Sequence, residues 1–120
     1  MTPPLEAAQR EVLELLGFVF LQNARPEKAE AIYAALLALE PRNPRYALSL
    51  ACAQVRGGKC EPALGQLDKM LERGDISAPV HLLRGQALAK LGRDSEAQRA
   101  LKAYIAARQS EPAAGQSSVG

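Results

Sequence analysis

The chain of 120 residues has few of the side chains that most often build active sites. It contains one histidine, His81, two cysteines, Cys52 and Cys60, and no tryptophan. The cysteines stand eight residues apart, a spacing that fits neither a redox CxxC pair nor a zinc site. A histidine-activated nucleophile or a metal centre would have no second histidine to use. We therefore expect no metal, no cofactor and no catalytic residue, and we expect His81 and Cys60 to be ordinary packing residues.

The sequence also lacks long apolar runs and a large net charge. Its longest uncharged runs, Leu15–Ala24 and Tyr46–Val55, have about ten residues, whereas a membrane-spanning helix needs about 20. The 15 basic and 13 acidic residues are interspersed and give a net charge of +2, so electrostatics favours neither nucleic acid nor an anionic membrane. The first six residues lack the basic and apolar regions of a signal peptide. We expect a cytoplasmic protein without membrane insertion.

Aromatic residues are scarce as well, at 4% of the chain, although apolar residues reach 48%. A core of this composition must be built from leucine and alanine, which favour helices and allow them to pack closely. One domain is the natural expectation for a chain of this length. The composition therefore predicts a single helical domain.

What the sequence does contain is a repeat of 34 residues. Three sets of small residues recur at that spacing: Gly17, Ala51 and Gly85; Ala24, Gly58 and Gly92; Ala29, Ala63 and Ala97. Alanine is frequent, at 22 of 120 residues, so the joint recurrence of small, apolar and turn positions carries the inference. Thirty-four residues is the length of one helix–turn–helix unit in tetratricopeptide repeats. We predict an all-α fold, a right-handed α-solenoid of three such repeats, in preference to an unrelated helical bundle.

The units are predicted at about 10–43, 44–77 and 78–111, in a domain of residues 1–110 that is followed by a disordered tail, 111–120. Residues at helical spacing define the packed face of each helix. In the first helices these are Leu13, Leu16, Gly17 and Phe20; Ala47, Leu50, Ala51 and Gln54; His81, Arg84, Gly85 and Leu88. In the second helices they are Ala29, Tyr33, Leu36 and Leu37; Ala63, Leu67, Met70 and Leu71; Ala97, Leu101, Tyr104 and Ile105. Arg84 departs from the pattern, because that position is usually apolar.

Proline and glycine mark the predicted helix boundaries. Pro26 is expected to begin a helix with Glu27 in its first turn, where the helix dipole favours an acid. Pro41 and Gly74 are expected to end the first and second units. The segment Gly57-Gly58-Lys59 is predicted to be a turn, because it lacks the upstream glycine, the following hydroxyl residue and the strand of a phosphate-binding loop.

The two ends of the chain differ from its middle. Thr2 is a candidate N-cap and Pro3 a candidate first helical residue, so the first helix is predicted to run from about Pro3 to Gln22. Solenoids normally end in a capping element with a polar outer face, and no such element follows Ser110. Part of the last helix is therefore expected to remain uncovered unless a partner or a second copy of the chain packs on it.

In a tetratricopeptide solenoid, the first helix of every unit lines the concave side. Positions on these helices that packing does not use are expected to face a groove, with Glu11 and Arg45 at its rim. The candidate groove residues are Glu14, Phe18, Leu21 and Gln22; Arg45, Leu48, Cys52, Val55 and Arg56; Leu82, Gln86, Ala89 and Lys90. The centre of the set is apolar, so the expected ligand is an amphipathic helix or an extended apolar segment of another protein. The alternative for any single residue is a place in the core.

Some chaperone-binding proteins of this repeat class grip a C-terminal carboxylate with lysine and asparagine side chains in the groove. The corresponding positions of this chain hold Glu14, Phe18, Ser49, Pro79 and Leu83. None of these side chains is a cation or an amide. The sequence therefore excludes a carboxylate clamp of that kind.

With its repeats aligned, the chain resembles the tetratricopeptide chaperones of bacterial type III secretion, and most closely the YscY type. The resemblance is clearest in Gln9-Arg-Glu-Val-Leu-Glu-Leu-Leu-Gly-Phe18 and in Leu21-Gln22. It continues through Ala29, Leu36-Leu37, Leu39 and Pro41 and covers about residues 9–109, weakening in the second unit. The departures are Arg84 and the tail rich in alanine, glycine and serine.

The resemblance implies a cytosolic chaperone that binds a small, early-secreted subunit of the YscX type as a heterodimer. The pair would then engage the cytosolic domain of the large export-gate protein. The family has no cofactor and no catalytic residues. Its members place a helical segment of the subunit against the solenoid, which matches the apolar groove expected from the repeat positions.

A second hypothesis keeps the same repeats but assigns them another use. A general scaffold or assembly factor would bind folded proteins, and charges on its convex face would then matter more than apolar residues in its groove. An enzyme is the third hypothesis, and nothing in the chain assembles a catalytic site. The groove and the uncovered last helix favour the chaperone.

Overall fold

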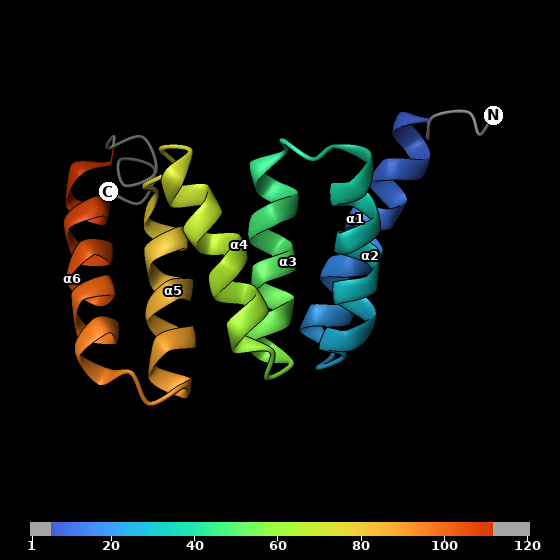
Figure 1. Cartoon of the computed structure of the whole chain (residues 1–120). Coiled ribbons are helices and arrows are strands. Elements are labelled where there is room, and N and C mark those ends of the chain that lie inside the picture. Colours follow the sequence, from blue (N-terminus) through green and yellow to red (C-terminus); the bar gives the residue numbers. More distant parts are fainter. Residues whose placement is uncertain (1–5, 112–120) are drawn as a thin grey trace, which may run out of the picture.

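The computed structural model describes residues 6–111, which form six α-helices and contain no strand. The helices are α1 (Ala7–Gln22), α2 (Pro26–Leu39), α3 (Pro44–Arg56), α4 (Cys60–Glu72), α5 (Ala78–Lys90) and α6 (Asp94–Ser110). Figure 1 shows them following one another across the molecule, with α1 and α6 at opposite ends. The predicted all-α class is confirmed.

The helix boundaries inside each helix pair recur every 34 residues. The second helix of each pair begins at Pro26, Cys60 or Asp94, and the first helix of each pair ends at Gln22, Arg56 or Lys90. Each helix packs against the next one along the chain, and α3 also packs against α5. The period seen in the amino-acid sequence is therefore also a period of the backbone.

The turn inside each helix pair has the same backbone geometry. Its central residue has a positive φ: 56° at Ala24, 81° at Gly58 and 76° at Gly92. The following amide donates to a carbonyl five residues earlier: Arg25 to Phe20 (2.8 Å), Lys59 to Gln54 (2.7 Å) and Arg93 to Leu88 (2.9 Å). This bond closes a Schellman motif, which satisfies carbonyls at the helix end. The predicted turn at Gly57-Gly58 is confirmed.

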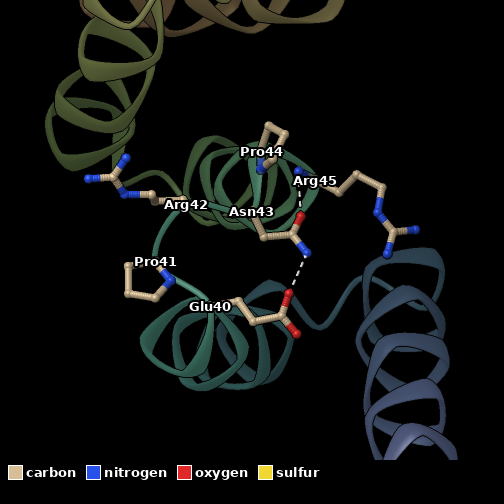
Figure 2. Close-up of a pocket in the computed structure, with 6 residues that line it drawn as sticks. All are labelled: Glu40, Pro41, Arg42, Asn43, Pro44 and Arg45. Atoms are coloured by element: carbon tan, nitrogen blue, oxygen red, sulfur yellow. Dashed lines mark hydrogen bonds between the residues drawn. The ribbon is translucent and has the colours of Figure 1, made fainter.

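The connection between α2 and α3 is organised by Asn43. Its Oδ1 accepts from the amides of Arg45 (3.0 Å) and Tyr46 (3.4 Å), and its Nδ2 donates to Glu40 Oε1 (3.1 Å). Pro44 is the first helical residue, where its missing N–H is not needed. Figure 2 shows Glu40 and Arg45 on either side of Asn43, around a shallow hollow that the loop itself lines.

Two clusters of buried side chains form the core. One joins α2 and α3 through Ala29, Tyr33, Leu36, Tyr46, Leu50 and Ala53. The other runs from α3 to α6 and consists of Ala47, Ala51, Val55, Cys60, Ala63, Leu64, Leu67, Met70, Val80, Ala87, Leu88, Ala97 and Ala100. The small residues predicted at packing positions are therefore buried, as expected for closely spaced helices.

Gly17 and Gly85 lie where the two helices of a pair come closest. A Cβ atom built on Gly17 would lie 2.8 Å from Tyr33 Cζ, and one on Gly85 would lie 2.7 Å from Leu101 Cδ2. Tyr33 and Leu101 stand one helical turn beyond Ala29 and Ala97, the alanines that were expected to face these glycines. The side chains of Tyr33 and Leu101 therefore fill the space that a Cβ atom on Gly17 or Gly85 would need.

Two of the polar side chains at predicted packing positions, Arg84 and Gln54, have partners on the preceding helix. Arg84 Nε lies 2.9 Å from Asp68 Oδ1 on α4, which explains why a cation is tolerated at a position that is usually apolar. Gln54 is buried, and its Nε2 donates to Glu30 Oε2 on α2 at 3.4 Å. Both contacts join one helix pair to the previous one.

The N-terminal part of the fold differs from the prediction. Helix α1 begins at Ala7 rather than Pro3, and Glu6 is its cap, with an extended backbone and an amide that donates to Gln9 Oε1 at 3.1 Å. Thr2 and Pro3 lie outside the described residues. Leu16 was expected to be packed but is 40% exposed, because no helix precedes α1 among the described residues.

At the C-terminal end, α6 closes at Ser110. Glu111, which was assigned to the tail, is extended, and its carboxylate accepts from the amide of Ala78 at 3.2 Å, at the start of α5. The rest of the predicted disordered tail, 112–120, lies outside the described residues. As expected, α6 carries exposed apolar side chains, Leu101 and Ile105. Within residues 6–111, no helix combines the length and the apolar character needed to cross a membrane.

Candidate functional site

A groove with a volume of about 660 Å³ runs across α1, α3 and α5, the first helices of the three pairs. Its lining is mainly apolar. The residues are Phe18, Leu21, Tyr33, Leu48, Ser49, Cys52, Val55, Arg56, Pro79, Leu82, Leu83, Gln86 and Lys90. A groove of this size is within the range that binds a ligand or the side chains of a partner segment.

Most of the residues that the repeat pattern proposed are brought together here. Those lining the groove are Phe18, Leu21, Leu48, Cys52, Val55, Arg56, Leu82, Gln86 and Lys90. The structure leaves out of the lining Glu14, Gln22, Arg45 and Ala89. Nine of the proposed residues therefore line one groove, and four do not.

The apolar part of the groove has a mouth and a floor. Phe18 stands at the mouth with 53% of its surface exposed, and Val55 lies at the floor, 3% exposed and within the core. Between them Leu48, Cys52 and Leu82 are half-buried. Val55 therefore acts mainly as a core residue, the alternative that was left open for single positions. Within the groove lining, the ring of Phe18 is the large apolar side chain most available to a partner.

One end of the groove carries two cations held in equivalent positions. Arg56 Nη1 donates to the carbonyl of Leu21 at 3.3 Å, and Lys90 Nζ donates to the carbonyl of Val55 at 3.1 Å. Each acceptor lies in the last turn of a helix, where carbonyl groups carry partial negative charge. The cations thus tie α3 to α1 and α5 to α3 while making this end of the groove positive.

Gln22 occupies the repeat position equivalent to Arg56 and Lys90, and it is exposed. In the part of the chain that the structure describes, no helix pair precedes α1 to offer Gln22 an equivalent carbonyl. Ala89 is also exposed and does not line the groove. Both residues were proposed from their repeat positions. A repeat position does not tell whether another helix lies beside the residue.

Glu14 and Arg45 join two helices rather than line the groove. Arg45 Nη2 lies 3.3 Å from Glu14 Oε1, and the hydroxyl of Tyr46 donates to Glu14 Oε2 at 2.8 Å. Burial, with the hydrogen bond to Glu14 as the next cause, raises the pKa of Tyr46 to about 12. The carboxylate of Glu14 is thus engaged by two residues of α3 and fixes α1 against that helix.

Four residues of the lining were not among the proposed groove residues: Tyr33, Ser49, Pro79 and Leu83. The last three are among the positions that the sequence comparison with a carboxylate clamp singled out, and that signal could have identified them. Tyr33 comes from α2 and reaches the groove because Gly17 leaves room for its ring. Burial is the main cause that raises its pKa. A pattern confined to first helices could not find it.

The remaining reactive side chains are dispersed. Cys60 is buried, Cys52 is half-buried in the groove, and neither is in a disulfide. His81 is half-buried beside α6, in a hollow that includes Ile76 and Ala107. Across residues 6–111, no three histidine, cysteine or acidic side chains are grouped as metal ligands would be.

Comparison with protein-family models gave no match to this sequence, and comparison with curated proteins gave none either. The functional interpretation therefore depends on the groove and on the sequence pattern.

Proposed function

We propose that the chain is a right-handed solenoid of three tetratricopeptide repeats that holds an apolar segment of another protein in its groove. The observation that carries the proposal is the apolar groove formed by α1, α3 and α5, with Phe18 exposed at its mouth. The 34-residue recurrence of the helix boundaries supports the repeat class. A monomer gains nothing from exposing such a surface, whereas a protein partner would bury it.

The charges at one end of the groove indicate which kind of helix would bind and in which direction. Arg56 and Lys90 stand at one end of an otherwise apolar lining. An amphipathic helix would place its apolar face on Phe18, Leu48 and Leu82, as helix-in-groove complexes do. Its C-terminal end, or acidic residues near that end, would lie beside the two cations because the helix dipole is negative there.

We propose further that the protein is a cytosolic chaperone of a type III secretion system. This step rests on the sequence resemblance to the YscY type and on the agreement between the expected ligand and the apolar groove. In this role it would hold a small early-secreted subunit of the YscX type as a heterodimer. It would then deliver that subunit to the cytosolic domain of the export-gate protein.

Co-expression with a YscX-type subunit from the same genome tests the proposal. A 1:1 complex is expected on size-exclusion chromatography, and Phe18→Asp is expected to abolish it. Leu39→Asp is the matched control, because Leu39 is as exposed as Phe18 but lies outside the groove. Loss of the complex on changing convex-face charges, with Phe18→Asp still bound, would instead support a scaffold for folded proteins.

A peptide assay tests the groove separately from the choice of secretion partner. The probe is a synthetic amphipathic helix with leucine at i, i+3, i+4 and i+7 and a single tryptophan. Because the protein has no tryptophan, the fluorescence reports the peptide alone. We expect saturable binding that Phe18→Asp weakens at least tenfold, about 1.4 kcal/mol. Equal affinity for both proteins would place the peptide elsewhere and refute the assignment of the groove.

A further inference from the structure

Helix α1 carries a stripe of exposed apolar side chains. The α1 stripe consists of Val12, Leu15, Leu16 and Val19, whose spacing of three, one and three residues places them on one helix face. Val12 is 61% exposed and Val19 is 47% exposed. The groove described above does not include any of the four residues.

The repeat explains what kind of surface this is. Residues one and two repeat lengths after Val12 are Tyr46 and Val80, and those after Val19 are Ala53 and Ala87; all four are buried. Tyr46 and Ala53 are in the core cluster with residues of α2, and Val80 and Ala87 are in the cluster with residues of α4. In α3 and α5 these positions therefore pack against the preceding helix pair. The α1 stripe has the same residue character, but within residues 6–111 no helix pair precedes it.

The opposite end of the molecule carries the other half of such a contact. Leu101 and Ile105 of α6 are exposed, and we call them the α6 patch. The equivalent residues of α4, Leu67 and Leu71, are buried and half-buried in a core that α5 completes. The α6 patch is exposed because no further helix follows α6 within the described residues. Figure 1 shows that α1 and α6 lie at the two ends of the row of helices.

Charges beside the two surfaces are complementary. Glu11 is exposed on α1, one helical turn from Leu15. Lys102 and Arg108 are exposed on α6, each three residues from Ile105 and hence on the same side of the helix. Contact between α1 and α6 would bring opposite charges together, whereas contact between two copies of α1 would bring Glu11 near its own equivalent.

We propose that a second copy of this chain covers the α1 stripe. The α6 patch of one copy packs against the α1 stripe of the next, as α4 packs against α5 within one chain. Because the two surfaces differ, the contact is heterologous and leaves one free surface at each end of the assembly, so it can propagate. This inference does not rest on the proposed function, since it uses neither the groove nor a partner protein.

Two sets of substitutions test the α1 stripe and the α6 patch independently. Analytical ultracentrifugation of the full chain measures the mass of the assembly that each variant forms. Val12→Lys combined with Val19→Lys blocks only the α1 stripe, and Ile105→Lys blocks only the α6 patch. Leu15→Lys provides a second α1 variant, so that the result does not depend on the folding of one protein. Ile76→Lys is the control, because Ile76 is exposed in the loop between α4 and α5 and belongs to neither surface.

The wild type and Ile76→Lys are expected to exceed the mass of a dimer as concentration rises, and each blocked variant is expected to remain a monomer. A mixture of an α1 variant with Ile105→Lys should form a 1:1 dimer and nothing larger, because one intact α6 patch meets one intact α1 stripe. A monomeric wild type overturns the proposal. Dimers of Ile105→Lys alone overturn it as well, since they would require contact between two copies of α1.

Discussion

At the scale of single residues, glycine is used in two different ways in this chain. Gly17 and Gly85 lie in helices and leave room for Tyr33 and Leu101. Gly58 and Gly92 lie in turns and provide a positive φ, a conformation that side chains with a Cβ disfavour. The first use sets how closely two helices approach. The second sets where a helix ends.

Gly17→Ala is expected to destabilise the protein by about 1–3 kcal/mol, because the new Cβ would lie 2.8 Å from the buried Tyr33 ring. Gly65→Ala is the control, since a Cβ at this position in α4 meets no atom within 4 Å. That control should gain up to about 1 kcal/mol from helix propensity. Urea unfolding followed by circular dichroism measures both changes, and equal effects would contradict the close approach at Gly17.

Ala24 is the one non-glycine residue with a positive φ among residues 6–111, and it stands where the other two turns have glycine. The left-handed conformation costs a residue with a Cβ about 1–2 kcal/mol. Ala24→Gly removes this cost but adds unfolded-state entropy, so a net gain of about 1 kcal/mol is expected. Thermal unfolding tests it against Ala106→Gly, an exposed helical site where a loss of about 1 kcal/mol is expected.

At the scale of the helices, the caps differ between equivalent positions. Asn43 caps α3 with two backbone amides as donors, whereas Ser77, one repeat later, makes no side-chain cap bond to α5. Asn43→Ala is therefore expected to cost about 1 kcal/mol and Ser77→Ala clearly less. Denaturant midpoints of the two variants provide the comparison. A cost at Ser77 equal to that at Asn43 would show that the cap bonds contribute little.

The contact between α1 and α3 should make stability depend on alkaline pH. Tyr46 has its pKa raised from 10.0 to about 12 by burial and by its hydrogen bond to Glu14, so the unfolded chain releases this proton first. Stability from Tyr46 is complete below pH 10 and is lost as the pH rises from about 10 to about 12. Tyr46→Phe should flatten this decline in unfolding experiments at alkaline pH. Tyr33 contributes in the same direction, because burial raises its pKa too.

At the scale of the whole molecule, the groove exists only because three helix pairs are stacked. Its lining comes from α1, α2, α3 and α5, and Arg56 and Lys90 connect the successive first helices. A ligand in the groove should therefore stabilise the entire array. The two exposed ends, on α1 and α6, follow from the same stacking, because each of these helices has a packing face without a neighbour among residues 6–111.

The amphipathic peptide, at a free concentration of 100 times its Kd, is expected to raise the free energy of unfolding by about 2.7 kcal/mol. Thermal unfolding with increasing peptide measures this shift. Phe18→Asp should abolish it at the same peptide concentration, while Leu39→Asp should retain it. A shift of the same size in Phe18→Asp would mean that the peptide binds away from the groove.

The sequence by itself determined the helical class, the 34-residue period and the helix boundaries that proline and glycine mark. These features depend on local interactions: proline and asparagine at helix starts, positive-φ residues at helix ends, and small residues at fixed spacing. The boundary at Ala7 was missed because the cap depends on Glu6 and Gln9 rather than on the proline that was expected to begin the helix. Apart from that end, the local signals agreed with the fold.

The tertiary structure decided which of the equivalent positions are buried. Leu16 and Leu50 occupy the same repeat position, yet Leu50 is buried and Leu16 is exposed, because α3 follows a helix pair whereas α1 is the first helix of the described residues. Glu14 was expected to face the groove, but its carboxylate instead accepts a hydrogen bond from Tyr46 and pairs with Arg45. Tyr33, by contrast, lines the groove from α2. Burial depends on what surrounds a side chain in space. A repeat pattern gives each position its role within a unit but not its neighbours at the ends of the array.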